Sequence, residues 1–276
     1  MTRFACGRFD LDLSTPRIMA IVNLTDDSFS GDGLRGNVAA ALRQAEKALE
    51  DGADLLDLGA ESTRPGSDPV SDAQEIARIA PVVEALFRLN VPLSVDTLKP
   101  AVMRAALAAG ADMINDIKGF GAPDALEAVA GSRCGLCVMH MQGEPRTMQR
   151  EPYYFDVVAD VADYLAGRVR TLVAAGVARE RIMLDPGFGF GKSVDHNYSM
   201  LKHCARFAVD GLPVLVGLSR KSMLGAVTGK AVHERIIASV TGAALAVEHG
   251  ARIVRVHDVA ATREALQVWR ACAEAA

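Results

Sequence analysis

The sequence predicts an α/β fold, a single closed (β/α)8 barrel of the TIM type that begins with a short N-terminal hairpin or plug. Three observations support this fold. Short runs rich in Val, Ile, Leu and Met alternate with longer segments of helical period. The stretches EDGADLLDLG, AAGADMIND and EHGARIVRVHD repeat one order of helix end, glycine and strand. The glycine-rich fingerprint of an open dinucleotide-binding sheet is missing from the sequence.

The segment that contains FDLDL, before the first apolar run, predicts the hairpin or plug. Eight apolar runs then predict the strands, and being apolar on both faces they are expected to lie between helices and an inner core. In order, the runs are RIMAIVN from residue 17, ADLLDLGA from 53, VPLSVDT from 91, ADMINDI from 111, GLCVMH from 135, RIMLDPG from 181, LPVLVGLS from 212 and ARIVRVHD from 251.

The segments between these runs predict the helices. Examples are NVAAALRQAEKALEDG and HERIIASVTGAALAVEHG, which end in glycine just before the next run, the usual stop signal of a helix. No linker or low-complexity segment interrupts the pattern, so we expect one domain over residues 1–276.

Composition narrows the class of function. The formal charge is −4 and no block of Lys and Arg occurs, which argues against nucleic acid as a partner. No run has the length of a signal peptide or of a membrane span, and the five cysteines suit reduced thiols, so we expect a cytoplasmic protein. We expect the two cysteines of CGLC to be buried in a strand.

In such a barrel the chemistry lies at the C-terminal ends of the strands. Almost every apolar run ends in polar or charged residues, whereas the starts of the runs carry fewer such groups. The residues at the ends are Asn23, Glu61, Ser62, Thr63, Arg64, Asp96, Thr97, Asn115, Asp116, His140, Asp185, Ser219, Arg220, Lys221, Arg255 and His257. Singly, each of them has a structural explanation such as a helix cap or a loop anchor; together, they predict a site.

Two kinds of chemistry occur in this set. The cationic and hydroxyl side chains suit an anionic leaving group such as a phosphate, and Asn23 offers an oxygen to a magnesium ion. Asp96, Asn115 and Asp185 are hydrogen-bond acceptors, which suit a flat ring with N–H donors. We therefore expect one mouth to hold a heterocycle and a phosphate together.

The stretch LDPGFGFGKS resembles a phosphate-binding loop but has Pro186 in place of the first required glycine. We expect its three glycines, Gly187, Gly189 and Gly191, to let the backbone pass close to a planar ligand. Lys192 is expected to face solvent.

Seven ordered motifs, IVNLTDDSFS, GAESTRPGS, SVDTLKP, INDI, DPGFGFGK, GLSRKSMLG and RVHDV, closely resemble the dihydropteroate synthase family over nearly the whole chain. The resemblance implies a magnesium-using transferase, usually a homodimer. Such an enzyme condenses 6-hydroxymethyl-7,8-dihydropterin diphosphate with 4-aminobenzoate to give 7,8-dihydropteroate and pyrophosphate in folate biosynthesis. Because sulfonamides imitate aminobenzoate, the resemblance also implies inhibition by them.

The resemblance assigns roles residue by residue. The pterin would be held by Asp96, Asn115, Asp185 and Lys221, stacked on Arg255 and lined by Met139 and Phe190. The pyrophosphate would be held by Asn23, Thr63, Arg255 and His257, with Asn23 acting through Mg²⁺. Aminobenzoate would be surrounded by Thr63, Pro65, Ser219, Arg220 and Lys221, with Arg64 and Phe29 on loops that close over it.

The first loop departs from the family pattern, since Asp26 replaces a proline and Gly31 and Asp32 alter its end. This leaves open a catalytically impaired pterin-binding paralogue. A pterin-dependent methyltransferase is a second alternative, but it would need no grip on phosphate. A Schiff-base aldolase using Lys221 is a third. Because Arg220 precedes it, Lys221 suits contact with an anion better than the role of an amine of lowered pKa.

Overall fold

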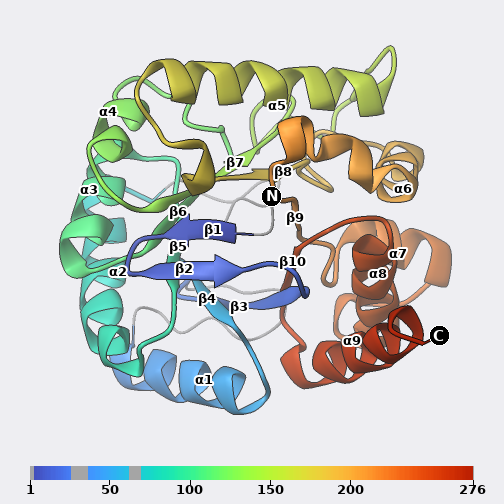
Figure 1. Cartoon of the computed structure of the whole chain (residues 1–276), viewed down its shortest axis with the longest axis horizontal. Coiled ribbons are helices and arrows are strands. Elements are labelled where there is room, and N and C mark those ends of the chain that lie inside the picture. The colour runs from blue at the N-terminus through green and yellow to red at the C-terminus, as the bar shows by residue number, and fades with distance from the viewer. Residues whose placement is uncertain (1–2, 26–36, 62–69, 276) are drawn as a thin grey trace.

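The computed structural model describes residues 3–25, 37–61 and 70–275, and within them eight parallel strands form a nearly closed barrel (Figure 1). Their order is β8-β7-β6-β5-β4-β3-β10-β9, and a bridge between Leu184 and Val214 brings the two ends of the sheet together. The strands are β3 (Arg17–Asn23), β4 (Leu55–Gly59), β5 (Leu93–Asp96), β6 (Met113–Asp116), β7 (Gly135–Met139), β8 (Ile182–Asp185), β9 (Leu215–Val216) and β10 (Ile253–Val256). Each lies within one of the eight predicted runs, which confirms the predicted barrel.

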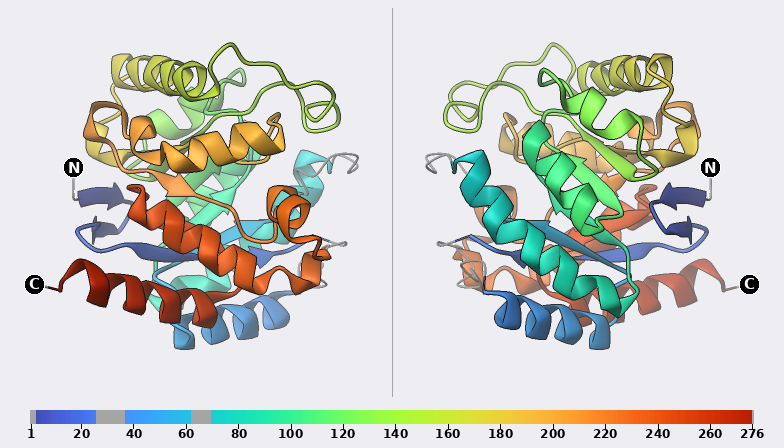
Figure 2. Two further views of the ribbon diagram at one scale, coloured as in Figure 1. Left: turned by 90° about the vertical axis from the view of Figure 1, so that its right-hand side faces the viewer. Right: turned by 90° about the vertical axis from the view of Figure 1, so that its left-hand side faces the viewer.

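Helices surround this barrel on its outer side (Figures 1 and 2). They are α1 (Val38–Glu50), α2 (Asp72–Leu86), α3 (Pro100–Ala109), α4 (Ala125–Ala130), α5 (Val157–Ala174), α6 (Val194–Lys202), α7 (Ser222–Thr228), α8 (Ile236–Glu248) and α9 (Val259–Ala273). None of the helices in the described ranges combines the length and the apolar character needed to cross a bilayer.

The internal repeat has a shared backbone geometry. Gly52, Gly110 and Gly250 have φ values of 100°, 107° and 104°, a region that side chains of L-residues disfavour. In each repeat the alanine after the glycine donates its N–H to a carbonyl five residues earlier in the helix, as between Ala111 and Ala106 at 3.0 Å. The repeated glycine therefore stops the helix and turns the chain into the next strand.

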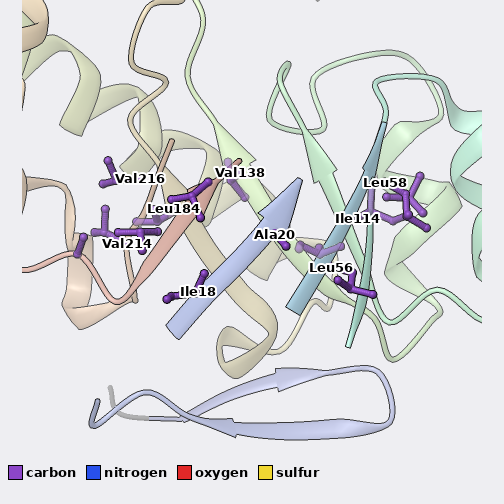
Figure 3. Close-up of a cluster of buried hydrophobic side chains, with 14 of the residues drawn as sticks. Ile18, Ala20, Leu56, Leu58, Ile114, Val138, Leu184, Val214 and Val216 are labelled. Atoms are coloured by element: carbon purple, nitrogen blue, oxygen red, sulfur yellow. The ribbon is translucent and has the colours of Figure 1, made fainter. Parts of the chain in front are cut away.

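Alternate strand residues point outward and form the larger core with the helices. Figure 3 shows members of this layer, including Ile18 and Ala20 on β3, Leu56 on β4 and Val138 on β7. All four are buried, as expected for a parallel sheet covered by helices. Cys134 also belongs to this core.

The antiparallel hairpin β1 (Arg3–Cys6) and β2 (Phe9–Asp12) closes the N-terminal end of the barrel (Figure 2). Its side chains pack against residues of the strands that point inward, and this second core consists of Phe4, Cys6, Leu13, Met19, Leu55, Met113, Cys137, Met183, Leu215 and Ile253. Gly135 makes room for the plug, because a Cβ there would lie 2.6 Å from the Phe4 ring. The predicted hairpin or plug is confirmed. Both cysteines of CGLC are buried as predicted, but only Cys137 lies in β7, because the strand begins after Cys134.

Candidate active site

The plug leaves the C-terminal ends of the strands as the end of the barrel available to a ligand. Asn23, Asp96, Asn115 and Asp185 close β3, β5, β6 and β8, or lie in their last two residues. Asp96 and Asn115 are register partners on adjacent strands. The described part of the predicted set therefore gathers at one mouth. Outside the described residues lie the candidates Ser62, Thr63, Arg64, Pro65 and Phe29 and the altered positions Asp26, Gly31 and Asp32.

Arg255 bridges two carboxylates inside the barrel. Its Nε donates to Oδ2 of Asp57 at 2.5 Å, and its Nη2 donates to Oδ2 of Asp96 at 3.1 Å. Burial lowers the pKa of the Arg255 guanidinium, but Asp57 and Asp96 outweigh this effect and raise the pKa above its ordinary value. The guanidinium is therefore permanently charged and fixed in orientation. The sequence did not single out Asp57, although a carboxylate within an apolar run was a usable signal.

The acceptors at the mouth are strongly desolvated. Burial, reinforced by Asp57 and opposed by Arg255, raises the pKa of Asp96 to about 7. Burial also raises the pKa of Asp185, while Lys221 opposes the shift. Among the described residues, the buried Oδ1 of Asn115 has no hydrogen-bond partner. A buried acceptor without a partner is costly, so this atom is suited to a donor supplied by a ligand.

Lys221 lies close enough to Asp185 and Asp96 for their charges to act on its amine. Its Nζ donates to the carbonyl of Phe188 and lies 4.6 Å from the centre of the Phe190 ring. Burial lowers the pKa of Lys221 to about 8, and Asp185 opposes that shift. Our expectation that Lys221 would lack the lowered pKa of a Schiff-base lysine was therefore wrong, because the sequence did not reveal that the half-buried amine is desolvated at the mouth.

The glycine-rich stretch after β8 forms a compact turn, Gly187–Gly191. A Cβ at Gly187 would lie 1.9 Å from the carbonyl oxygen of His140, and a Cβ at Gly191 would lie 2.3 Å from that of Gln142. Both glycines have positive φ. These two are thus required by close packing on the segment after β7, a reason that differs from the predicted approach to a planar ligand.

Phe188, Phe190 and Lys192, which belong to the same stretch, differ in their surroundings and in how far they are buried. Phe188 is fully buried in the outer core, whereas Phe190 is half-buried and contacts Lys221. Lys192 is only 3% exposed, so the expectation that it faces solvent was wrong. Its ammonium is enclosed because the turn folds over it and offers carbonyl oxygens to it.

The family described as "Pterin binding enzyme" matches residues 19–257 of the chain. The chain belongs to the pterin-binding enzyme family. It is 52% identical to a dihydropteroate synthase from Haemophilus influenzae over 96% of this chain and 97% of that protein.

Two solved structures show the same barrel as this pterin-binding enzyme. Burkholderia cenocepacia dihydropteroate synthase complexed with 7,8-dihydropteroate has a TM-score of 0.91 and 56% identity, covering 99% of this chain and 96% of that chain. Xanthomonas albilineans dihydropteroate synthase with 4-aminobenzoic acid has a TM-score of 0.92 and 46% identity, covering 100% of this chain and 99% of that chain. The expected family and fold class are therefore confirmed.

In this pterin-binding enzyme, the loop after β9 is joined to the loop after β10. Its consecutive residues Ser219 and Arg220 contact His257 and Asp258. Ser219 Oγ lies 2.9 Å from Nδ1 of His257 and accepts the His257 backbone N–H at 3.2 Å. Arg220 Nη2 and Nε donate to the two carboxylate oxygens of Asp258 at 2.6 and 3.1 Å. Arg220 also has a φ of 59°, so the loop holds it in a conformation that non-glycine residues rarely adopt. The sequence did not single out Asp258.

Glu61 anchors the segment that follows β4, as expected. Its Oε1 accepts the backbone N–H of Val70 at 3.1 Å, and its Oε2 lies 2.7 Å from Nζ of Lys99. Lys99 also pairs with the buried carboxylate of Glu75 at 2.7 Å. Residues 61 and 70 are thus held together beside the mouth of the pterin-binding barrel.

Proposed function

We propose that this pterin-binding enzyme is a dihydropteroate synthase, a transferase that condenses 6-hydroxymethyl-7,8-dihydropterin diphosphate with 4-aminobenzoate. The products are 7,8-dihydropteroate and pyrophosphate. The observation that carries the proposal is 56% identity to the Burkholderia cenocepacia enzyme that binds 7,8-dihydropteroate, over 99% of this chain. In this proposal the whole chain, residues 1–276, is one pterin-binding domain.

The pterin binds among the desolvated acceptors at the mouth. Asp96, Asn115 and Asp185 accept hydrogen bonds from the amino-pyrimidine edge, and the partnerless Oδ1 of Asn115 gains its donor there. Lys221 donates to the oxo side, and Arg255, oriented by its two carboxylates, stacks on the ring. Met139 and Phe190 line the slot.

The diphosphate binds beside this ring. In the proposal Thr63, Arg255 and His257 hold it as hydrogen-bond donors and cations, and Asn23 holds Mg²⁺. The described residues contain no cluster of three or more His, Cys, Asp and Glu able to hold a metal. Mg²⁺ usually keeps several waters and binds substrate phosphates besides one or two carboxylates, so in this site the phosphates and waters would supply most of its ligands and Asn23 one amide oxygen. The bound cation would stabilise charge on the leaving diphosphate.

The reaction exchanges one bond at the pterin methylene for another. The C–O bond breaks with its electron pair leaving on pyrophosphate, the amine nitrogen forms the new C–N bond, and the amine loses one proton to water or to the departing pyrophosphate. The methylene cation is delocalised into the ring, so a site that fixes the ring and binds the departing anion accelerates this step. An aryl amine is nucleophilic while neutral, so no general base is needed.

Aminobenzoate enters the outer part of the mouth. In the proposal Thr63, Pro65, Ser219, Arg220 and Lys221 surround it. The described geometry supports indirect roles for two of them, since Ser219 and Arg220 fix the loop that carries Lys221 through His257 and Asp258. Arg64 and Phe29 belong to the loops expected to close over the substrates and exclude water.

We also propose that the chain forms a homodimer through α7, α8 and α9, which are neighbours in Figure 1. Large apolar side chains remain exposed on these helices, including Val227 at 63%, Ile237 at 82% and Val268 at 69%. Sedimentation of the wild type and of Ile237→Glu tests this assembly, because a charged residue in the interface would favour monomers. The five cysteines are free, which suits a reducing cytoplasm.

The decisive experiment measures pyrophosphate release from the pterin diphosphate with Mg²⁺, with and without 4-aminobenzoate. Release that depends on aminobenzoate, with dihydropteroate as product, is the expected result. Binding of the pterin diphosphate without product would instead identify a catalytically impaired paralogue. Absence of binding would contradict the proposed function altogether.

A further inference from the structure

Lys192 follows the turn Gly187–Gly191 and extends back into it. Its Nζ donates to the carbonyl oxygens of Gly187 and Phe190 at 2.9 and 3.0 Å, and lies 3.0 Å from Nδ1 of His140. The residue is only 3% exposed. One buried ammonium therefore connects the two ends of the turn with the end of β7.

Other side chains hold the rest of the turn. Asn197 Oδ1 accepts the N–H of Gly189 at 2.7 Å, and the hydroxyl of Tyr154 donates to the carbonyl of Gly191 at 2.9 Å. The amide of Gln149 donates to the carbonyl of Gly189. The turn is thus fixed along its length, and Lys192 is its buried internal support.

The charge of Lys192 has a substantial cost in this position. Burial lowers the pKa of Lys192 to about 7, with Asp185 opposing and Lys221 reinforcing the shift. Burial and then Lys192 lower the pKa of His140 to about 3, so His140 is a neutral imidazole that can accept at Nδ1. A methionine would occupy similar space without this cost. Lysine therefore differs from methionine here in its directional hydrogen bonds and in a charge that favours the ionised form of Asp185.

The turn carries the groups that the proposed function assigns to the pterin. The backbone N–H of Gly187 donates to Oδ1 of Asp185 at 2.7 Å. Lys221 donates to the carbonyl of Phe188 and lies over the ring of Phe190. A displacement of the turn would therefore move the acceptor Asp185, the donor Lys221 and the ring of Phe190 at the same time.

We propose that Lys192 is a positioning residue that holds the Gly187–Gly191 turn in the shape required to present Asp185, Phe190 and Lys221 to the pterin. This inference rests on the proposed function. It assigns Lys192 no contact with either substrate.

The test compares Lys192→Met, which removes the donors at similar length, with Lys202→Met at an exposed lysine on α6. Calorimetry measures the Kd of the pterin diphosphate with Mg²⁺ for the folded fraction of each protein, and thermal unfolding gives each Tm. We expect Lys192→Met to weaken binding about tenfold or more, since hydrogen bonds that fix several pterin contacts are lost. Lys202→Met should bind like the wild type.

Steady-state kinetics add a second readout. With Lys192→Met, kcat/KM for the pterin diphosphate should fall further than kcat measured at saturating pterin, because saturation restores occupancy of the slot. Lys192→Gln retains an amide donor and should give an intermediate Kd.

The outcomes separate this inference from the proposed function. A lower Tm with an unchanged Kd would show that Lys192 serves stability alone and would overturn the inference. Failure of the Met, Gln and Arg variants at position 192 to fold would also overturn it, because the lysine would then be required for the fold itself. If the wild type does not bind the pterin diphosphate, the proposed function fails, and this inference fails with it.

Discussion

Arg255 and Asp57 form an ion pair inside the barrel, with Nε 2.5 Å from Oδ2, although 198 positions separate them in the chain. The Asp57 side chain is fully buried, and within the described residues its second oxygen has no partner. Arg255 also pairs with Asp96, so the two carboxylates hold the guanidinium from two sides. Breaking a buried pair from one side leaves the other charge uncompensated.

We therefore expect Asp57→Ala to lower the free energy of unfolding by about 3–5 kcal/mol and to weaken pterin binding. Urea unfolding and calorimetry measure the two effects. Asp163→Ala, at an exposed position on α5, is the matched control and should leave both unchanged. If Asp57→Ala unfolds and binds the pterin like the wild type, the position of Arg255 does not depend on the Asp57 carboxylate.

Asp185→Asn should weaken pterin binding selectively. The substitution keeps the shape of the side chain but removes a charged acceptor, and hydrogen bonds to charged groups contribute about 1.5–3 kcal/mol. We expect the Kd of the pterin diphosphate to rise roughly tenfold or more. Asp163→Asn provides the control. An unchanged Kd would remove Asp185 from the pterin site.

The pH dependence of kcat/KM should be bell-shaped. Asp96 accepts hydrogen bonds with both oxygens only when it is ionised, because protonation turns one oxygen into a donor. Burial, reinforced by Asp57, Glu75 and Asp116 against Arg255, raises its pKa to about 7. Activity should therefore rise with pH through about 7.

We expect the fall of kcat/KM at high pH to come from Lys221, whose ammonium is proposed to donate to the pterin ring. Burial lowers its pKa to about 8, so activity should fall as pH rises above about 8. Profiles of the wild type from pH about 5.5 to 9.5 record both limbs, and the profile of Asp96→Asn tests the assignment of the acidic limb. The variant should lose the acidic limb, while any titration of the substrate itself persists. The same acidic limb in both proteins would refute the role of Asp96.

Gly187→Ala should be far more destabilising than Gly176→Ala. Both glycines have positive φ, 70° and 88°, so both substitutions carry a backbone cost of about 1–2 kcal/mol. A Cβ at Gly187 would also lie 1.9 Å from a carbonyl oxygen, whereas a Cβ at Gly176 would meet nothing within 4 Å. Denaturant midpoints of the two variants measure the difference, and equal midpoints would contradict the close packing of the turn.

A sulfonamide should inhibit the enzyme competitively with 4-aminobenzoate, because both present an aryl amine to the same outer pocket. Adding aminobenzoate at fixed pterin diphosphate should restore the rate. Inhibition that persists at saturating aminobenzoate would place the drug elsewhere.

The strands and the described strand-end residues could be predicted because a parallel barrel needs continuous apolar runs and directs their C-terminal ends to one mouth. Other residues could not be predicted. The role of Asp57 depends on a partner 198 positions away, and that of Asp258 on a neighbouring loop. Lys192 was misjudged because its burial depends on how closely the turn packs against the segment after β7, which periodicity does not encode.

The plug of the barrel has a consequence for folding during synthesis. Phe4 packs in one cluster with Ile253 of the last strand, which is synthesised much later. At about 5–20 residues per second, roughly 10 to 50 s separate the synthesis of these two residues. Throughout that interval Phe4 and Leu13 lack part of their final partners, so the nascent chain carries an unburied apolar surface until the last strand has been synthesised.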